Sequence, residues 1–385
     1  MRPLLLALVT LLLGCAPAFG QTVTAETIGK QKTGVVPIEL SVPVPPTAFR
    51  GDGLYHLCYE IHITNLSSIT WTVQNIQVMN QSGGPLLTVA GKELDGVFFH
   101  PARPRDAKPA PGAGIAPGEA VIAYMWVDLP KDAALPSGLQ NRISVKKGET
   151  DVVEAEVPSV KVLSQVPAIM SPLRGKNWVA ANGPSNSSQH RRAMIVVDGT
   201  PHIAQRYAID WVQSAADFKT YHGDPKDNRS YYCFGQEAHA IADATVVEVK
   251  DGIPENVPNE KAAVPITLET IAGNHVNLDL GGGVYAMYAH LQPGSIRVKV
   301  GDKVKTGQVL GLVGNTGNSS EPHLHFQLMN ANSPLGSEGL PYALTYQYEG
   351  KMSGDGDKVT LDKAGAPQAR HEDIPMEDEL VDFEQ

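Results

Sequence analysis

Two histidines stand one residue apart in the stretch EPHLHFQL, which runs from Glu321 to Leu328. Side chains of a β-strand return to the same face every two residues, about 7 Å apart. His323 and His325 would therefore lie side by side, with Leu324 pointing into the core. Two adjacent imidazoles can serve one metal site, one as a ligand and one beside it. The loop GNTGNSSEP before them favours delivery of the pair to a surface groove over two separate surface histidines.

A third histidine, His290, ends the strand-like stretch VYAMYAHL, whose alternation predicts that Tyr288 and His290 share one face. From Gly281 to Gly317 the predicted strands are short and glycines fall at the turns, which is typical of a compact curled sheet. Eight of the twelve histidines lie between residues 166 and 349. We therefore look for chemistry in the second half of the chain.

The sequences YAHL, VKVGDKVKTGQVLGLVGNTG and EPHLHFQL resemble the lysostaphin-type zinc metalloendopeptidases, which cut peptide bridges of bacterial cell walls. The resemblance spans roughly residues 167–344 and implies an antiparallel β domain, Zn²⁺ as cofactor, and peptidoglycan or another peptide as substrate. It also implies that His325 binds zinc, and that His290 and His323 act in catalysis. The family's other two zinc ligands come from a His-x-x-x-Asp motif, and the resemblance implies that Asp210 in AQRYAIDWV is the Asp of that motif.

One ligand position of the family is altered in this chain. The family carries a His-x-x-x-Asp motif, and Arg206 stands at the position of that histidine. An arginine side chain stays protonated and cannot bind zinc, so we expect it to hydrogen-bond Asp210 or a substrate carboxylate. Two nearby histidines are candidates for the missing ligand: His190 is our prediction, and His202 is the second choice, because it lies eight residues from Asp210 along its own strand.

The preference for His190 rests in part on a variant branch of the family, which GPS, HRR and AQRYAIDW resemble and which implies a histidine upstream of the QRYAxD block. It rests also on a predicted β-hairpin, RRAMIVVDGTPHIAQRYAIDWV, with DGTP in the turn. A turn over residues 198–202 would place His190 opposite Asp210. A tighter turn, in which Val197 faces Thr200, would place His190 within one or two positions of the same patch. With His190, Asp210 and His325, zinc would have three N/O ligands and an open position, the composition of a catalytic site. No HExxH glutamate is present to act as a general base.

The first half of the chain predicts a different kind of domain. Short alternating strands separated by turn residues run from about Val35 to Val162. We predict an immunoglobulin-like β-sandwich over residues 21–165, followed by the metallopeptidase domain over residues 166–349. The mature chain would hold two cysteines, Cys58 and Cys233, which we expect to be buried free thiols.

The N-terminus predicts export. Arg2 precedes an apolar stretch, and AFG stands before Gln21 at a spacing typical of signal cleavage, so residues 1–20 are predicted to be a signal peptide. The stretch LLGC also resembles a bacterial lipobox, and in that alternative Cys15 carries a lipid anchor. No later segment is long and apolar enough for a transmembrane helix. We therefore expect a periplasmic, cell-envelope or secreted protein.

The formal net charge of −10 is unevenly distributed. Residues 354–385 hold 10 Asp and Glu against 3 Lys and Arg, a net charge of −7. The rest of the chain is close to neutral, which argues against a nucleic-acid-binding protein. The acidic stretch of residues 350–385 has little strand or helix pattern and is predicted to be disordered.

Three functions compete. The first is an active, exported zinc endopeptidase. The second is a degenerate, non-catalytic module that binds the wall or activates a partner hydrolase, an alternative favoured only by the change at Arg206. The third is a lipoyl- or biotinyl-carrier domain, suggested by VGDKVKTGQVLG, but Lys303 and Lys305 lack the required context and a carrier has no use for the HLH motif. We favour the enzyme because Asp210 and the three histidines of the motif regions are retained together.

Overall fold

The computed structural model describes residues 36–101, 103, 113–148, 151–354 and 359–384. The predicted signal peptide and the alternative anchor at Cys15 lie outside these residues. The described chain is almost entirely β, with one short helix α2 (Glu93–Val97) and one 3₁₀-helix η1 (Asn228–Ser230). Within it, no helix is long and apolar enough to cross a membrane. The predicted mainly β fold class is confirmed.

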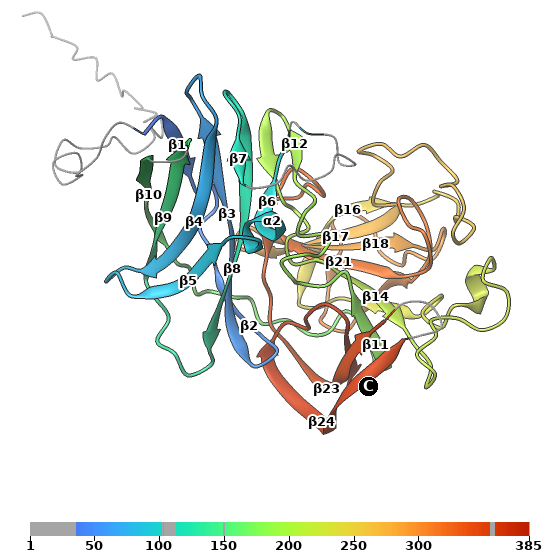
Figure 1. The fold of residues 1–385 in the computed structure, drawn as a ribbon. Helices are drawn as coiled ribbons and strands as arrows, with labels where there is room; N and C mark the ends of the chain where they lie inside the picture. The colour runs from blue at the N-terminus through green and yellow to red at the C-terminus, as the bar shows by residue number, and fades with distance from the viewer. Residues whose placement is uncertain (1–35, 102, 104–112, 149–150, 355–358, 385) are drawn as a thin grey trace, which may run out of the picture. The chain divides into compact units, whose positions relative to one another are not determined.

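Two antiparallel five-stranded sheets occupy the first half of the described chain (Figure 1). The first runs in the order β1 (Ile38–Ser41), β3 (Leu54–Asn65), β8 (Ala120–Pro130) and β6 (Phe98–Phe99), with β2 (Ala48–Gly51) paired to β3. The second runs in the order β10 (Asp151–Lys161), β9 (Gly138–Lys147), β4 (Trp71–Asn80) and β5 (Pro85–Ala90), with β7 (Gly114–Ile115) paired to β4. Alternating burial along β4 agrees with the alternation of apolar and polar residues in its sequence.

The second half is built around one eleven-stranded antiparallel sheet. Its order is β19 (Lys303–Val304), β16 (Ala244–Lys250), β17 (Asn274–Gly281), β18 (Val284–Leu291), β21 (Leu324–Met329), β14 (Ile209–Gln213), β11 (Gly175–Ala181), β25 (Glu379–Phe383), β23 (Leu344–Ser353) and β24 (Thr360–Asp373), with β22 (Gly339–Leu340) paired to β21. Two small hairpin-like sheets join β12 (Ile195–Val197) to β13 (Thr200–His202), and β15 (Glu237–His239) to β20 (Val309–Leu312). Both halves belong to one compact unit, Pro37–Gln385.

The prediction of a disordered tail is wrong for its described residues. Strands β24 and β25 come from the acidic stretch, and β25 pairs with β11 in the interior of the large sheet (Figure 1). Val381 and Phe383 are buried in the main core, and the ring of Phe383 lies edge-on to Trp211 at a centroid distance of 5.2 Å. The buried carboxylate of Glu379 accepts a hydrogen bond from Arg370 at 2.7 Å. The prediction of disorder considered the charge composition and not these apolar residues. Their burial provides the favourable free energy that offsets the conformational entropy lost when the tail becomes ordered.

Candidate metal centre

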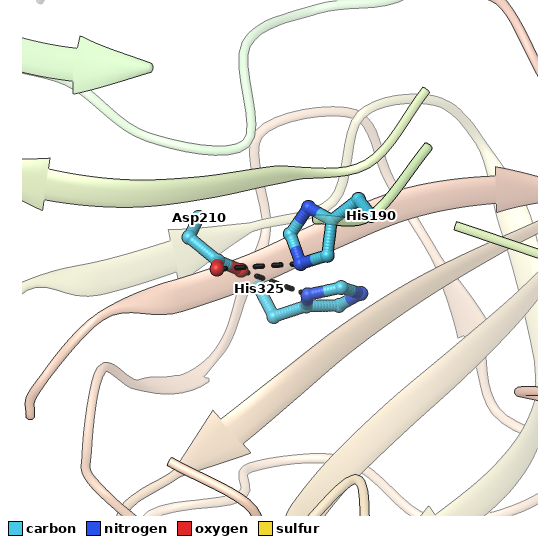
Figure 2. Close-up of side chains that lie close together, drawn as sticks. All are labelled: His190, Asp210 and His325. Carbon is cyan, nitrogen blue, oxygen red and sulfur yellow. Dashed lines mark hydrogen bonds and ion pairs between the residues drawn. The ribbon is translucent and has the colours of Figure 1, made fainter. Parts of the chain in front are cut away.

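Asp210 lies at the centre of the site because of its register in the sheet. It is the direct cross-strand partner of His325 on β21 and of Ala181 on β11. Cross-strand partners on one face have Cβ atoms about 5 Å apart, so the two side chains meet. The Nδ1 atom of His325 lies 2.8 Å from Oδ1 of Asp210 (Figure 2). The other ring nitrogen of His325, Nε2, bonds to Oε1 of Gln327 at 2.8 Å, which fixes the orientation of the ring.

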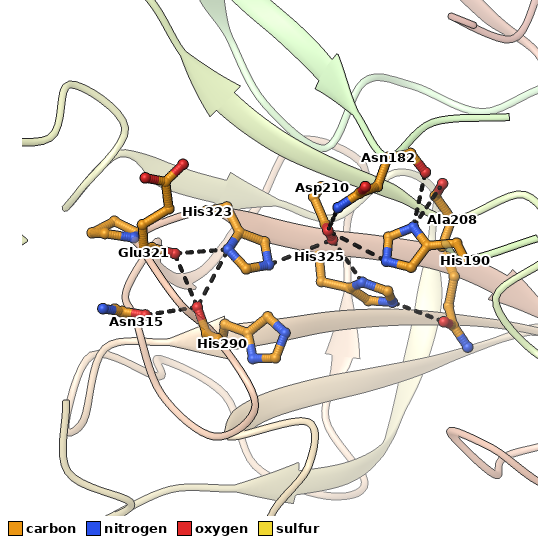
Figure 3. A network of polar contacts seen from close by, with 12 residues as sticks. Asn182, His190, Ala208, Asp210, His290, Asn315, Glu321, His323 and His325 are labelled. Carbon is orange, nitrogen blue, oxygen red and sulfur yellow. Dashed lines mark hydrogen bonds and ion pairs between the residues drawn. The ribbon is translucent and has the colours of Figure 1, made fainter. Parts of the chain in front are cut away.

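The structure places His190 beside the same carboxylate. Its Nε2 atom lies 3.3 Å from Oδ2 of Asp210, and its Nδ1 atom lies 3.0 Å from the carbonyl oxygen of Asn182. Asn182 follows directly after β11 and has a left-handed backbone (φ 49°), a conformation that asparagine tolerates better than most residues. Its side-chain amide also donates to Oδ2 of Asp210 at 2.9 Å (Figure 3). Asn182 thus orients both His190 and Asp210, a role that no sequence pattern indicated.

The route by which His190 reaches the site differs from the predicted hairpin. The hairpin is short and tight: Val197 pairs with Thr200, and the paired residues extend only to Ile195 and His202. His190 precedes this hairpin and lies in a turn, where the peptide N–H of Arg192 donates to the carbonyl of Ser188. His190 therefore lies close to Asp210 as predicted. A turn after β11 brings it there, and not the pairing of two strands.

The three side chains form a group with the composition of a zinc site. One ligand atom from each of His190, Asp210 and His325 lies within 4.8 Å of the others (Figure 2). Their exposures are 9%, 9% and 3%, so the donors are shielded from bulk water. Nitrogen and carboxylate donors in this number suit Zn²⁺ with an open coordination position. With Nδ1–H of His190 donating to a backbone carbonyl, the nitrogen facing the group keeps its lone pair, as a ligand requires. The residues therefore fit the expected metal.

His290 enters the site through a β-bulge. Met287 and Ala289 line the cleft beside the metal group, whereas Tyr288 lies in the main core. Regular alternation would send His290 to the core with Tyr288, but His290 has a left-handed backbone (φ 63°) and lines the cleft. The predicted shared face of Tyr288 and His290 is therefore wrong. The pairs Asn274–Leu291 and Val276–Tyr288 leave two residues of β18, Ala289 and His290, opposite one residue of β17, and this bulge re-aims the imidazole.

The imidazoles of His290 and His323 lie next to each other, with ring centroids 4.7 Å apart. Nδ1 of His290 lies 2.7 Å from the carbonyl oxygen of Thr316. Nδ1 of His323 lies 2.8 Å from the carbonyl oxygen of Glu321 (Figure 3). With both Nδ1–H groups donating to carbonyls, the Nε2 atoms are the ones available for chemistry. Nε2 of His323 lies 3.4 Å from Oδ1 of Asp210, so this pair adjoins the metal group.

The charge states of the group follow from its burial and its neighbours. Burial acts to raise the pKa of Asp210, but His190 and His323 outweigh it and hold that pKa well below its usual range. Burial lowers the pKa of His290 far below its ordinary value, and the neighbouring His323 and His325 act in the same direction. For His323, burial lowers the pKa but the Asp210 carboxylate raises it more, so the net shift is upward. Asp210 is thus an anion, as a zinc ligand must be, and His290 is a neutral imidazole.

The expectation that Arg206 bonds Asp210 or a substrate is wrong. Arg206 is 3% exposed and its guanidinium pairs with Glu60 at 2.7 Å and with Glu338 at 2.9 Å. Neither of these partners belongs to the metal group. The second candidate ligand, His202, is also outside the group, because its Nδ1 atom bonds to Glu338 at 3.1 Å.

An open cleft of about 690 Å³ leads to these side chains. It reaches His190, Asp210 and His325 as well as the catalytic candidates His290 and His323. All five residues predicted from the sequence therefore line one cavity, and its volume is in the range typical of ligand-binding pockets.

The remaining histidines and cysteines of the described chain lie elsewhere. His239 bonds to the carbonyl of Gly307, and His275 bonds to Glu248 and to the carbonyl of Gly273. His222 is exposed and stacks near Tyr232. Cys58 and Cys233 are buried free thiols, as expected.

Comparison with known proteins connects part of this chain with one peptidase family. Residues 232–336 match peptidase family M23. The resemblance to the lysostaphin type is thereby confirmed, and M23 peptidases depend on zinc. The M23 segment contains His290, His323 and His325, whereas His190 and Asp210 precede it.

Curated proteins that are similar to part of this chain are endopeptidases by name. Glycyl-glycine endopeptidase ALE-1 of Staphylococcus capitis is 50% identical over 58 residues, which are 15% of this chain and 16% of that protein. Peptidoglycan DD-endopeptidase ShyA of Vibrio cholerae is 37% identical over 95 residues, 22% of each protein. The chain therefore aligns with only about a fifth of the length of these relatives. The solved catalytic domain of lysostaphin from Staphylococcus simulans is 24% identical, covers 43% of this chain and 88% of its own, and gives a TM-score of 0.24.

Proposed function

We propose that this protein is an exported zinc metalloendopeptidase that hydrolyses peptide bonds in bacterial peptidoglycan crosslinks. The observation that carries the proposal is the convergence of five side chains on one cleft: a His190–Asp210–His325 group within 4.8 Å and the adjoining pair His290 and His323. The M23 match and the names of the relatives support the reaction class and the substrate.

Each side chain has a role that its contacts support. His190, Asp210 and His325 would hold Zn²⁺, which supplies a Lewis acid that polarises the scissile carbonyl and acidifies water. Asn182 and Gln327 orient these ligands through hydrogen bonds. The Nε2 atoms of His290 and His323 face the cleft side of the group, where they move protons and stabilise the developing oxyanion.

Zinc analysis of matched histidine variants tests the proposal. Purified wild-type protein is expected to bind one zinc per chain and to release peptide fragments from isolated peptidoglycan, identified by mass spectrometry. His190→Ala and His325→Ala are expected to lose both properties, because each removes a ligand. His202→Ala is the matched control, since His202 lies in the same region but bonds Glu338, and it is expected to keep zinc.

The competing function is a degenerate module that binds the wall without cutting it. Wild-type protein that binds peptidoglycan but takes up no zinc from excess would establish that alternative. Zinc loss in His202→Ala alone would instead show that the ligand set is wrong.

Export is the second part of the proposal. The signal-like start favours mature protein beginning near Gln21, and N-terminal sequencing of protein from the native cell tests it. A lipid-modified start at Cys15 would establish the anchored alternative, and an intact Met1 would refute both.

A further inference from the structure

A buried charge cluster joins the first sheet to the turn that carries His190. Glu60 lies on β3, is 3% exposed, and is contacted by two arginines of the second half of the chain, Arg191 and Arg206. Arg191 is fully buried and is the residue next to His190. Arg191 donates to Oε1 of Glu60, and Arg206 donates to Oε2 at 2.7 Å and to Oε1 at 3.4 Å.

The turn makes further contacts with the same sheet. Arg191 also donates to the carbonyl of Tyr59 at 3.0 Å, and the guanidinium carbons of Arg191 and Arg192 lie 4.6 and 4.3 Å from the ring centre of Tyr124 on β8. The side-chain amide of Asn186 donates to the carbonyl of Tyr124 at 3.0 Å. Residues on both sides of His190 are therefore held by β3 and β8.

The chemistry of the cluster indicates that it fixes the geometry of the turn more than it stabilises the fold. Desolvating a carboxylate and two guanidinium groups offsets much of their attraction, and apolar replacements of buried ion pairs are often as stable as the original. Such groups can instead fix one arrangement of the chain. Here the arrangement that is fixed is the turn around His190. If Arg191 moved away from Glu60, its guanidinium would be left as a buried charge without that partner.

We infer that Glu60 of the first sheet is a positioning residue of the metal centre, holding His190 against Asp210 through Arg191. The inference rests on the proposed function for its metal, but the position of the turn can be measured without metal. Glu60 touches neither the ligands nor the cleft. The first sheet would then be part of the catalytic apparatus rather than an independent appendage.

Paired measurements on full-length variants test this inference. Glu60→Gln is compared with wild type by zinc-chelator competition and by metal-free hydrogen exchange of the amides of residues 186–193. We expect the zinc affinity of Glu60→Gln to be about tenfold lower or more, which is the loss typical when a hydrogen-bond partner of a metal ligand is removed. We also expect faster hydrogen exchange in the turn. Glu60→Asp, which keeps the charge, is expected to restore part of both properties. Glu119→Gln is the matched control. Glu119 is another carboxylate of the first half that pairs with an arginine, but its partner is Arg103 and not a residue of the turn.

A second variant covers the case in which Glu60→Gln does not fold. Glu60→Met/Arg191→Met/Arg206→Met replaces the charges by apolar side chains of similar size, and thermal unfolding monitored by circular dichroism establishes that it folds. A folded triple variant with weak zinc binding and fast exchange supports the inference. Wild-type zinc affinity and protection in any folded variant lacking the Glu60 charge overturns it. If wild type binds no zinc while Glu60→Gln still accelerates exchange in the turn, the proposed function fails and the positioning role stands.

Discussion

Asp210 and His325 face each other directly across β14 and β21, and the distance of 2.8 Å between their side chains is a consequence of that register. A shift of one residue would turn one of the two side chains to the opposite face of the sheet. The same register aligns Ala181, and with it the following Asn182, beside the carboxylate. Two residues of the metal group thus lie on paired strands, a placement that keeps ligand geometry tight, whereas His190 comes from a turn.

Removing the charge of Asp210 should abolish tight metal binding. Asp210→Asn keeps the size of the side chain but loses the anion that faces His190, His323 and His325. We expect zinc affinity to fall by more than the roughly 10–100-fold loss typical of outer hydrogen-bond partners, measured by chelator competition. Unchanged affinity would contradict the ligand role of Asp210.

The histidine pair should separate catalysis from metal binding. His323→Ala and His290→Asn are expected to keep zinc while turnover of peptidoglycan fragments falls on the order of 100-fold or more, because proton-transfer groups are lost. Asparagine is chosen for His290 because it tolerates the left-handed backbone there, so a folding defect is avoided. Full turnover in either variant, measured with metal content, would show that the residue is not catalytic.

Two substitutions of Asn182 should separate its side chain from its backbone. Asn182→Gly keeps the left-handed backbone and the carbonyl that accepts from His190, but removes the amide that donates to Asp210. We expect about a tenfold loss of zinc affinity. Asn182→Ala should show a similar loss and, in addition, a lower free energy of unfolding by about 1 kcal/mol, because alanine is strained at this φ. Wild-type affinity in Asn182→Gly would mean that the amide has no orienting role.

The C-terminal strand should contribute to stability. Phe383→Ala removes a buried ring that packs against Trp211, and we expect the free energy of unfolding to fall by about 3–5 kcal/mol in urea titrations. Lys363→Ala on the exposed face of β24 is the control, expected within about 0.5 kcal/mol of wild type. A neutral effect of Phe383→Ala would restore the prediction of a disordered tail.

Glu255 should make stability depend on pH. Burial raises the pKa of Glu255 to about 7, although one of its oxygens accepts a bond from the peptide N–H of Asn315. The folded protein thus binds this proton more tightly than the unfolded chain, whose glutamates titrate near 4.3. The resulting penalty develops as pH rises from about 4.3 to 7 and is complete above that range. Glu255→Gln should therefore be more stable than wild type at pH 8 by about 1–2 kcal/mol, allowing for partial exposure, and equal to it near pH 4. An equal difference at both pH values in urea unfolding would contradict this.

The sequence predicted those parts of the site that depend on local geometry. The two-residue period of a strand placed His323 beside His325 and sent Leu324, which is fully buried, into the core. The same two-residue period gave the wrong face for His290, because a β-bulge interrupts the strand there. No residue type in the sequence indicated this bulge. Hairpin counting reached His190 by the wrong route, since the strands end before that residue.

Contacts between distant segments were not predictable from spacing. The partners of Arg206 are Glu60 and Glu338, which lie 146 residues before it and well after it in the chain, so only the fold reveals its role. The tail was misjudged for a related reason. Its acidic composition predicts disorder, but its few apolar residues are buried by β11 and the core, which lie far away in the sequence.

The position of β25 between β11 and β23 also constrains the order of events during biosynthesis. β11 carries the polypeptide into Asn182 and the turn of His190, yet one of its two neighbours is made about 200 residues later. A chain that leaves the ribosome N-terminus first cannot complete this sheet until its last strand has emerged, and pairings of such long separation form slowly. The sheet that holds Asp210 and His325 therefore stays open beside β11 until the distant β25 has been synthesised.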